Sequence, residues 1–514
     1  MQTTAAGGNT RTIASNSFWN GLELVGSVVV AFATSIPMAR VIGPERMGYF
    51  NYVQWLTNLS GMIGLLGIPG ATRKYMAEYL GAGKPEVARS VFRATLRLQI
   101  VIASAIVAVG LPLVLWGAPA EYKLISSFLM LSLWPSMVAC IPSQANVAGE
   151  RMAFNTAGSL ASYVINIATV TLSLTLGWNL LGIAIGVLAF RAVDCGVRLF
   201  LVHRWLRDVP IIPLPNDVKR KMTSFSGFNL VLMILNMIVW DRSDMIFLRH
   251  LVRDTAQISF FSAAVNLVER VQSIPAAFGA AAFATIQAQY GRDRRELPKV
   301  ASNALWYSFA FSAPILLGLA AMSAQIVPFL YGAKYAPAIP VLAVAALLAI
   351  PKCLVAPVWS VMEAEARQGF LIGWLIFCAI ANMGLDLLLI PRMGAMGAAI
   401  ANGIAQLLLP LGLVWRVHSL FGLNFRLGAV GKLLLSSGVM TAVVVALASR
   451  FAAWWGMGIE VVLGAAVFFV CMRLASVLRA DDRQRLMLLE TLLPSAMRAS
   501  YARVVLFLAP VGRA

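Results

Sequence analysis

The sequence predicts an all-α polytopic membrane protein with about 14 transmembrane helices, arranged as two six-helix lobes in a parallel repeat plus two additional helices. Composition and one recurring pattern lead to this fold class. Hydrophobic residues make up 60% of the 514 residues and charged residues only 12%, and the mean hydropathy is +0.79. Apolar runs of about 18 residues or more recur along the chain. This composition excludes a soluble fold of this size.

Each apolar run is bounded by charged residues or by Pro and Gly clusters, and each is interpreted as one membrane span. A helix is the expected conformation, because a backbone in lipid must satisfy its own hydrogen bonds. In chain order the spans are expected to begin near Asn20, Gly48, Phe92, Leu124, Phe154, Leu180, Phe225, Ser259, Asn303, Ala338, Phe370, Met396, Gly428 and Met457.

The net charge of +19 is interpreted as a signal of membrane topology rather than of nucleic-acid binding. If the N-terminus is cytoplasmic, the even-numbered connections and the tail hold about 29 Lys and Arg residues, and the odd-numbered connections hold about eight. This asymmetry predicts that both termini lie in the cytoplasm. The first apolar run has no convincing cleavage site, so we expect no removable signal peptide.

A weak internal repeat recurs at a spacing of about 210 residues. Four matches occur in the same order: Tyr75–Tyr79 with Ile286–Tyr290, Gly149–Arg151 with Glu365–Arg367, Asn166 with Asn382, and Gly182–Gly186 with Gly397–Ala401. Each repeat holds six helices, an even number, so both halves enter the membrane from the same side. We therefore expect a substrate path between the two halves.

The repeat divides the chain into four parts. Residues 1–212 are expected to form the N-terminal lobe with helices 1–6, and residues 213–425 the C-terminal lobe with helices 7–12. Residues 426–476 hold two additional helices. Residues 477–514 mix arginines and leucines with a helical spacing, which predicts an amphipathic tail on the cytoplasmic membrane surface.

Charged residues inside the apolar segments of the second lobe indicate a polar cavity. A charge at such depth costs at least about 2.5 to 3.5 kcal/mol unless it faces a partner or a water-filled space. For each residue, an interhelical salt bridge that fixes the packing is an open alternative. The charged residues are Asp241, Arg242 and Asp244 on span seven, Glu269 and Arg270 on span eight, and Lys352 on span ten.

The first lobe carries a second set of polar residues. Asn20 and Glu23 share one face of span one, and Arg73 stands at the inner end of span two, as a ligand contact or as a positive-inside anchor. Arg191 and Asp194, three residues apart on span six, predict a structural ion pair. Cations in a membrane cavity suit a phosphate or pyrophosphate group, which guanidinium pairs bidentately. Carboxylates beside them could relay protons or bind sodium.

Three connections carry characteristic sequences: Arg40–Phe50, Phe329–Pro337 and Leu389–Ala399. They resemble polysaccharide flippases of the Wzx type, within the multidrug/oligosaccharidyl-lipid/polysaccharide exporter superfamily, and the resemblance extends from about Thr12 to the tail. It implies a two-lobed flippase of the bacterial inner membrane. Its expected activity is the translocation of an undecaprenyl-pyrophosphate-linked oligosaccharide by alternating access.

The resemblance also implies a site and partners. In similar proteins helices one, two, seven and eight line the cavity and carry essential arginines. The expected substrate-binding residues are Arg242, Arg270, Arg73, Asn20 and Lys352, and the expected charge partners or ion-coupling residues are Asp241, Asp244, Glu269 and Glu23. The expected partners are the lipid-linked oligosaccharide, membrane lipids, and polysaccharide polymerase and chain-length proteins. We expect a monomer that uses no nucleic acid, cofactor or metal.

Two other functions are considered. A multidrug and toxin extrusion antiporter of the same superfamily would carry organic cations and use carboxylates for coupling, but a cavity poor in arginine would be expected there. A scaffold or a membrane-embedded enzyme of glycan assembly is the second. The outward connections are each on the order of ten residues or fewer, and no catalytic constellation is recognisable, so we do not expect an enzyme.

Overall fold

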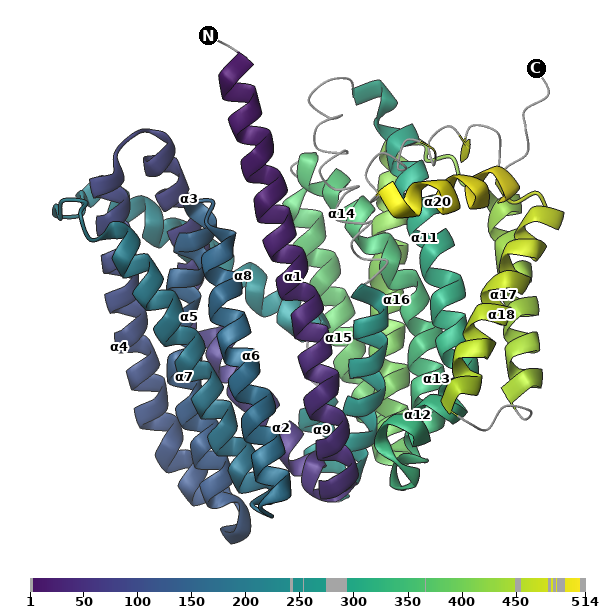
Figure 1. The fold of residues 1–514 in the computed structure, drawn as a ribbon, viewed down its shortest axis with the longest axis horizontal. Helices are drawn as coiled ribbons and strands as arrows, with labels where there is room; N and C mark the ends of the chain where they lie inside the picture. The colour runs from purple at the N-terminus through teal and green to yellow at the C-terminus, as the bar shows by residue number, and fades with distance from the viewer. Residues whose placement is uncertain are drawn as a thin grey trace. The chain divides into compact units, whose positions relative to one another are not determined.

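The computed structural model describes residues 3–240, 244–252, 254–273, 294–365, 367–448, 454–478, 482–483, 487 and 495–508. Within these ranges every regular element is a helix (Figure 1), which confirms the all-α prediction. The chain packs as two units, Met1–Met245 with Asp254–Ser259, and Ile246–Arg253 with Phe260–Ala514. The units are defined by packing and the predicted lobes by the internal repeat, so the lobe boundary at residue 212 stays a prediction.

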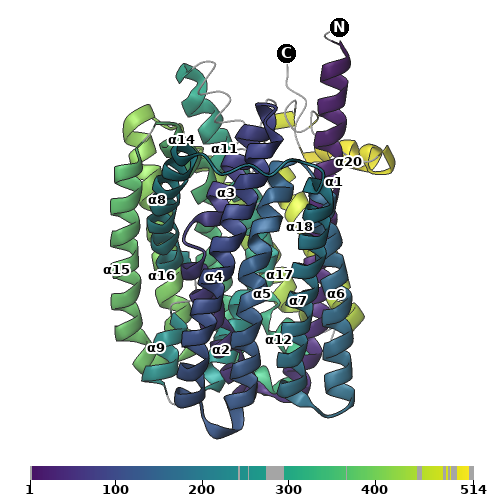
Figure 2. The ribbon, with the colours of Figure 1, turned by 90° about the vertical axis from the view of Figure 1, so that its left-hand side faces the viewer.

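The first unit is built of long helices that turn back on one another. Figure 2 shows α4, α5, α6 and α7 running side by side. Pro44 and Pro85 each open a helix, where the missing N–H of proline costs nothing. The helices are α1 (Thr3–Ile42), α2 (Pro44–Gly64), α3 (Ile68–Gly81), α4 (Pro85–Gly117), α5 (Lys123–Ala148), α6 (Met152–Thr175), α7 (Asn179–Leu206) and α8 (Asn216–Trp240), with a 3-10 turn η1 at Ala120–Tyr122.

The described helices of the second unit are shorter and more often interrupted. Pro351 lies in the 3-10 turn η4 (Ile350–Leu354), which separates α13 from α14, because proline cannot continue an α-helical hydrogen-bond ladder. The other elements are α9 (Asp244–Leu251), which begins at the division between the units, a helix over residues 256–273, η2 (Arg294–Glu296), α11 (Leu297–Ala321), α12 (Ser323–Tyr331), η3 (Ala333–Tyr335), α13 (Ala338–Ala349), α14 (Val355–Ala364), α15 (Gln368–Met393), α16 (Ala395–Phe421), α17 (Leu427–Ala448), α18 (Trp454–Leu474) and α20 (Ser495–Leu508).

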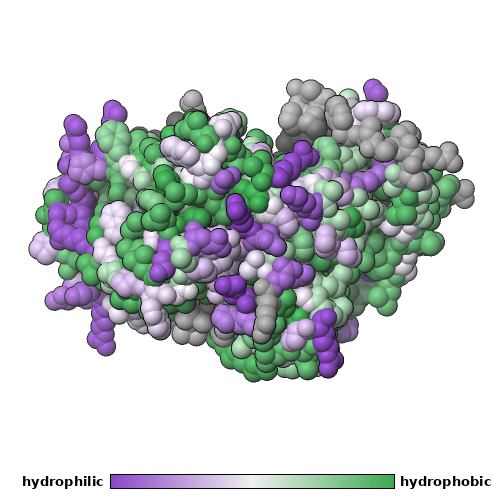
Figure 3. Space-filling view, turned by 90° about the horizontal axis from the view of Figure 1, so that it is seen from below, coloured by the Kyte–Doolittle hydropathy of each residue, from purple (hydrophilic) through white to green (hydrophobic). Residues whose placement is uncertain are grey.

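Eleven of the described helices are long and apolar enough to cross a membrane, so the chain is a multi-pass membrane protein. The spans expected near Phe225 and Ser259 run into residues outside the described ranges, and the total of about 14 spans therefore stays a prediction. Figure 3 views the end of the molecule where α1 turns into α2, and hydrophilic side chains lie there among hydrophobic ones.

Two arginines near helix starts fasten connecting segments of the chain. In the first unit Arg89 Nη1 donates to the carbonyls of Arg207, at 3.1 Å, and Val209, which holds the proline-rich linker that leads to α8. In the second unit Arg426 Nη1 lies 2.9 and 2.8 Å from the two carboxylate oxygens of Asp482. Asp482 is fully buried, so this pair ties the segment after α18 to the start of α17.

Candidate functional site

α2 is too polar to be counted among the membrane-crossing helices, although it has 21 residues. Asn51, Gln54 and Asn58 lie along one side of it, at spacings i, i+3 and i+7. A neighbouring side is buried, and a Cβ at Gly61 would come within 2.6 Å of Leu133 on α5. Asn58 remains exposed. In a protein surrounded by lipid such a stripe needs water or a polar partner, so α2 fits the wall of a polar space.

Arg191 on α7 contacts that polar side of α2. Its Nη2 donates to Asn58 Oδ1 at 3.1 Å and its Nη1 donates to Ser136 Oγ on α5. Its Nε is buried without a hydrogen-bond partner. The predicted ion pair between Arg191 and Asp194 is wrong, because the Asp194 carboxylate accepts instead from Arg198, one turn further along α7.

Arg198 is the centre of an ion network that joins α1, α6 and α7. Its Nε donates to Asp194 Oδ1 at 2.7 Å, and its Nη2 donates to Ser159 Oγ at 2.8 Å. Glu23 Oε1 lies 3.6 Å from the same Nη2 and accepts from Ser159 at 2.6 Å. The Arg198 side chain is only 10% exposed. Glu23, an expected charge partner, therefore faces an arginine that the sequence-based prediction missed.

Asn20 and Arg73, two expected substrate-binding residues of the first lobe, have exposed side chains. Asn20 lies on α1 nearly one turn before Glu23. Arg73 lies on α3, which begins after a break in which Leu66 (φ 49) and Gly67 (φ 70) adopt left-handed backbone angles. Neither side chain forms an ion pair with another described residue. Their substrate contacts therefore stay predictions.

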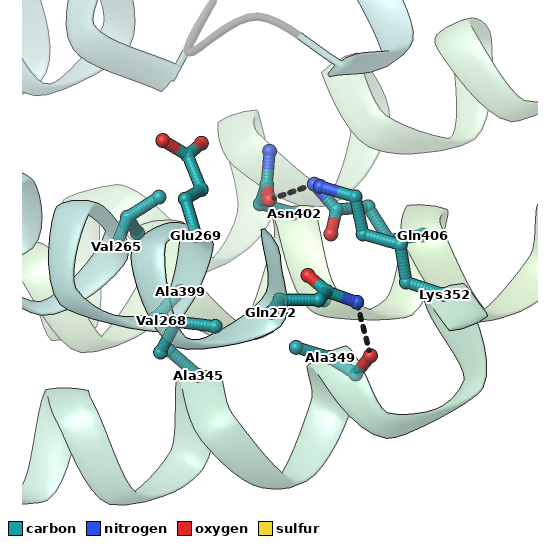
Figure 4. Close-up of a pocket in the computed structure, with 11 residues that line it drawn as sticks. Val265, Val268, Glu269, Gln272, Ala345, Ala349, Lys352, Ala399, Asn402 and Gln406 are labelled. Atoms are coloured by element: carbon teal, nitrogen blue, oxygen red, sulfur yellow. Dashed lines mark hydrogen bonds between the residues drawn. The ribbon is translucent and has the colours of Figure 1, made fainter. Parts of the chain in front are cut away.

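A small cavity in the second unit brings together two other expected residues, Glu269 and Lys352 (Figure 4). Glu269 comes from the helix over residues 256–273 and Lys352 from η4. The volume of about 20 Å³ is enough for about one water molecule. In Figure 4 the two charged side chains lie on opposite sides of the cavity, with Asn402 of α16 between them. The cavity thus has a cation, an anion and amide groups at its wall.

Amide side chains hold the wall of this cavity in place. Gln406 Nε2 donates to Asn402 Oδ1 at 2.8 Å along α16. Gln272 Nε2 donates to the carbonyl of Ala349 at 3.0 Å, at the point where α13 gives way to η4. Because these bonds satisfy polar groups away from bulk water, they fix the orientation of the side chains.

Span seven is described only in part. Asp241 and Arg242 lie outside the described residues. Asp244 is the first residue of α9 and is fully buried. Arg270 follows Glu269 and is partly buried; consecutive helix residues point about 100° apart. Arg270 does not line the cavity that holds Glu269 and Lys352.

Asn382 and Asp386 form a polar pair in the second unit that the sequence-based site prediction did not include. Both are fully buried on α15, and Asn382 Nδ2 lies 3.3 Å from Asp386 Oδ2. An amide and a carboxylate four residues apart inside an apolar run predict a hydrogen-bonded pair on one helix face, and Asp194 and Arg198 have the same spacing. The i, i+4 spacing therefore predicts both the Asn382–Asp386 pair and the Asp194–Arg198 pair from the sequence.

Comparison with known proteins agrees with this architecture. The family model described as "Polysaccharide biosynthesis protein" matches residues 13–288, more than half of the chain. The chain is also similar to the "Succinoglycan biosynthesis transport protein ExoT" of Rhizobium meliloti (strain 1021), with 25% identity over 391 residues, 73% of this chain and 74% of that protein.

Solved structures show the same fold at low sequence identity. The inward closed conformation of the lipid II flippase MurJ aligns with a TM-score of 0.70 and 18% identity, over 90% of this chain and 98% of that one. An inward-facing multidrug resistance MATE family transporter aligns with a TM-score of 0.62 and 17% identity, over 76% and 94%. The family match confirms the resemblance expected from the sequence, and the chain shares the fold of these two solved structures. The chain belongs to the polysaccharide biosynthesis protein family.

Proposed function

We propose that this protein is a flippase that moves an undecaprenyl-pyrophosphate-linked oligosaccharide from the inner to the outer leaflet of the bacterial inner membrane by alternating access. Its family, its multi-pass helical architecture and a relative named as a succinoglycan transport protein support this function. A transporter with this cargo must pass a polar sugar and an anionic linker through an apolar bilayer. It therefore needs polar groups in the interior of its helical bundle.

The observation that carries the proposal is the position of Lys352. It lies near the middle of the candidate span Ala338–Glu363 and lines a cavity together with Glu269. A lysine at this depth is costly in a bundle that only needs to pack. An ammonium group at the wall of a polar cavity attracts phosphate oxygens, and a nearby carboxylate offsets its charge when the cargo is absent.

In this mechanism the residues have separate roles. The cations Arg73, Arg242, Arg270 and Lys352 neutralise the pyrophosphate as it crosses, and Asn20 donates or accepts hydrogen bonds with the sugar. The carboxylates of Asp241, Asp244, Glu269 and Glu23 compensate the cations between cycles or couple the motion to an ion. We propose that the flipped product passes to polysaccharide polymerase and chain-length proteins.

Deletion of the gene in its native host tests this function. The expected result is loss of surface polysaccharide with accumulation of the lipid-linked oligosaccharide in the inner leaflet. Complementation with Arg242→Ala or Arg270→Ala is expected to leave export abolished while membrane levels of the protein stay normal. Normal export in both variants would contradict an anion-handling role for these two arginines.

A cation-coupled antiporter for organic cations is the second candidate, since a multidrug resistance MATE family transporter shares the fold. Buried carboxylates such as Asp386 would suit that activity. The same deletion strain separates the two functions. Sensitivity to several organic cations with normal polysaccharide export would favour the antiporter, and unchanged sensitivity with lost export would favour the flippase.

A further inference from the structure

We propose that Arg191 is a recognition site for the pyrophosphate linker in the first unit, where Asn58 and Ser136 hold its guanidinium group in position. This inference rests on the proposed flippase function and adds a contact residue that the sequence-based prediction assigned to packing.

The geometry leaves the guanidinium group free to bind a further oxyanion. Asn58 and Ser136 each accept one of its hydrogen bonds, from two different helices. Arginine has five N–H groups, so three remain, including the buried and unsatisfied Nε. The Nη2–Asn58 hydrogen bond is exposed, whereas Nε is buried, so a ligand that moves along the polar side of α2 meets the guanidinium group at Nη2.

The charge of Arg191 is not neutralised within the described part of the chain, where no carboxylate oxygen lies within the 4.0 Å limit for an ion pair. Asp194 acts on Arg191 electrostatically, but its carboxylate is paired with Arg198, as is that of Glu23. A cation in a membrane bundle that is held only by neutral oxygens is costly. That cost is offset when an anion arrives, so an anionic ligand would bind here with little reorganisation.

The internal repeat gives independent support. At the end of α5 the match of Gly149–Arg151 with Glu365–Arg367 has an offset of 216 positions, and in α7 the match of Gly182–Gly186 with Gly397–Ala401 has an offset of 215. Near span two, the match of Tyr75–Tyr79 with Ile286–Tyr290 has an offset of 211 positions. These offsets place three residues of the first unit opposite three of the second: Asn58 opposite Glu269, Ser136 opposite Lys352, and Arg191 opposite Gln406.

The corresponding residues also meet in space within each unit. Asn58 and Ser136 both accept hydrogen bonds from Arg191. Their counterparts Glu269, Lys352 and Gln406 all line the cavity of Figure 4. Each unit therefore has a polar cluster at the same place in its repeat, with one cation. The second cluster includes the carboxylate of Glu269, whereas the first contains only neutral partners. The first cluster is accordingly the one with a net positive charge.

Binding measurements on the full-length protein in lipid nanodiscs test the inference, with undecaprenyl pyrophosphate as the probe. The expected result for Arg191→Gln is an affinity lower by about tenfold or more, because a charge-assisted pair is lost. Arg191→Lys is expected to retain part of the affinity, since it keeps the charge but not the fork geometry. Arg207→Gln serves as the control, because the exposed side chain of this arginine in the same unit forms an ion pair only with Asp208 among the described residues.

The outcomes separate the inference from the proposed function. If the wild-type protein does not bind undecaprenyl pyrophosphate, the proposed function fails. If it binds and Arg191→Gln binds within about twofold of it, the inference fails alone. Inorganic pyrophosphate in competition shows whether the linker itself is recognised, and competition that is equal in wild type and Arg191→Gln contradicts recognition by Arg191.

A double variant that moves the positive charge from residue 191 to residue 136 tests the role of the charge even if Arg191→Gln alone folds poorly. The double change Ser136→Lys with Arg191→Gln copies the arrangement of Lys352 and Gln406 into the first unit. Because it restores one cation to the cluster, it is expected to recover about threefold or more of the lost affinity. No recovery in a double variant with wild-type melting temperature contradicts a role for the charge.

Discussion

Two carboxylates, those of Asp194 and Glu23, approach the single guanidinium group of Arg198 from different helices. Asp194 lies one turn away on α7, whereas Glu23 lies on α1 and shares the Ser159 hydroxyl with Arg198. The network therefore links α1 to the α6–α7 pair by charge rather than by apolar packing alone. α1 depends on it because much of its apolar surface, including Val25 and Val29, is exposed to the surroundings.

Removal of Arg198 alone is expected to destabilise the protein. Arg198→Gln leaves two acids without their cation, which costs about 3–5 kcal/mol for a buried pair. The double variant Arg198→Gln with Asp194→Asn removes one charge of each sign and is expected to lose less. Thermal unfolding in detergent, followed by tryptophan fluorescence, measures both. A single variant that is as stable as the double variant contradicts this account of the network.

Lys352 is expected to matter for transport more than for folding. Lys352→Met retains most of the side-chain volume but removes the charge from the cavity wall, so polysaccharide export is expected to fall by about tenfold or more. Lys334→Met is the matched control, because Lys334 is an exposed lysine in η3 outside the cavity. Export and membrane level are measured in the same deletion strain. Equal export by the two variants argues against a role in the cargo path.

At the scale of elements, the break between α2 and α3 fixes where α3, the helix that carries Arg73, begins. Gly67 adopts φ +70, a left-handed angle that only glycine adopts without strain. Leu66 is also left-handed, at φ 49, so the backbone turns over two consecutive residues. α3 can then present Arg73 at an angle that differs from the course of α2.

Gly67→Ala is expected to destabilise the α2–α3 junction by about 1 kcal/mol, because a Cβ is unfavourable at a left-handed angle. Gly81→Ala is the control: Gly81 ends α3 with open space around it and no unusual φ. There alanine is expected to be neutral or slightly stabilising. Melting temperatures of both variants in detergent test the difference, and equal values for the two would show that the turn is not strained.

The elements differ in how well the sequence predicts them. Long apolar runs such as Leu124–Ala148 and Leu180–Leu206 are assigned correctly, because their composition alone requires a helix in lipid. Partners of single charges are harder to assign, since helix spacing places Arg191 near both Asp194 and α2. Only the three-dimensional packing of α2, α5 and α7 decides that Arg191 turns towards Asn58 and Ser136.

At the scale of the whole molecule, the predicted topology follows from charge rather than from packing. Both termini and the even-numbered connections are expected in the cytoplasm, and this sidedness is still a prediction. Alkaline phosphatase and green fluorescent protein fusions after Gly83, Lys123 and the C-terminal residue test it. Fluorescence after Gly83 and at the C-terminus, with phosphatase activity after Lys123, is the expected pattern. The reverse pattern contradicts the charge-based assignment.

The most direct test of the central claim is a flipping assay with purified protein in liposomes. The liposomes carry a fluorescent undecaprenyl-pyrophosphate-linked oligosaccharide, and a membrane-impermeant quencher reports how much of it is in the outer leaflet. The account predicts that the wild-type protein makes the inner-leaflet pool accessible, and that Lys352→Met slows this by about tenfold or more while Lys334→Met does not. No acceleration by correctly folded wild-type protein over protein-free liposomes would contradict the claim that this chain is a flippase.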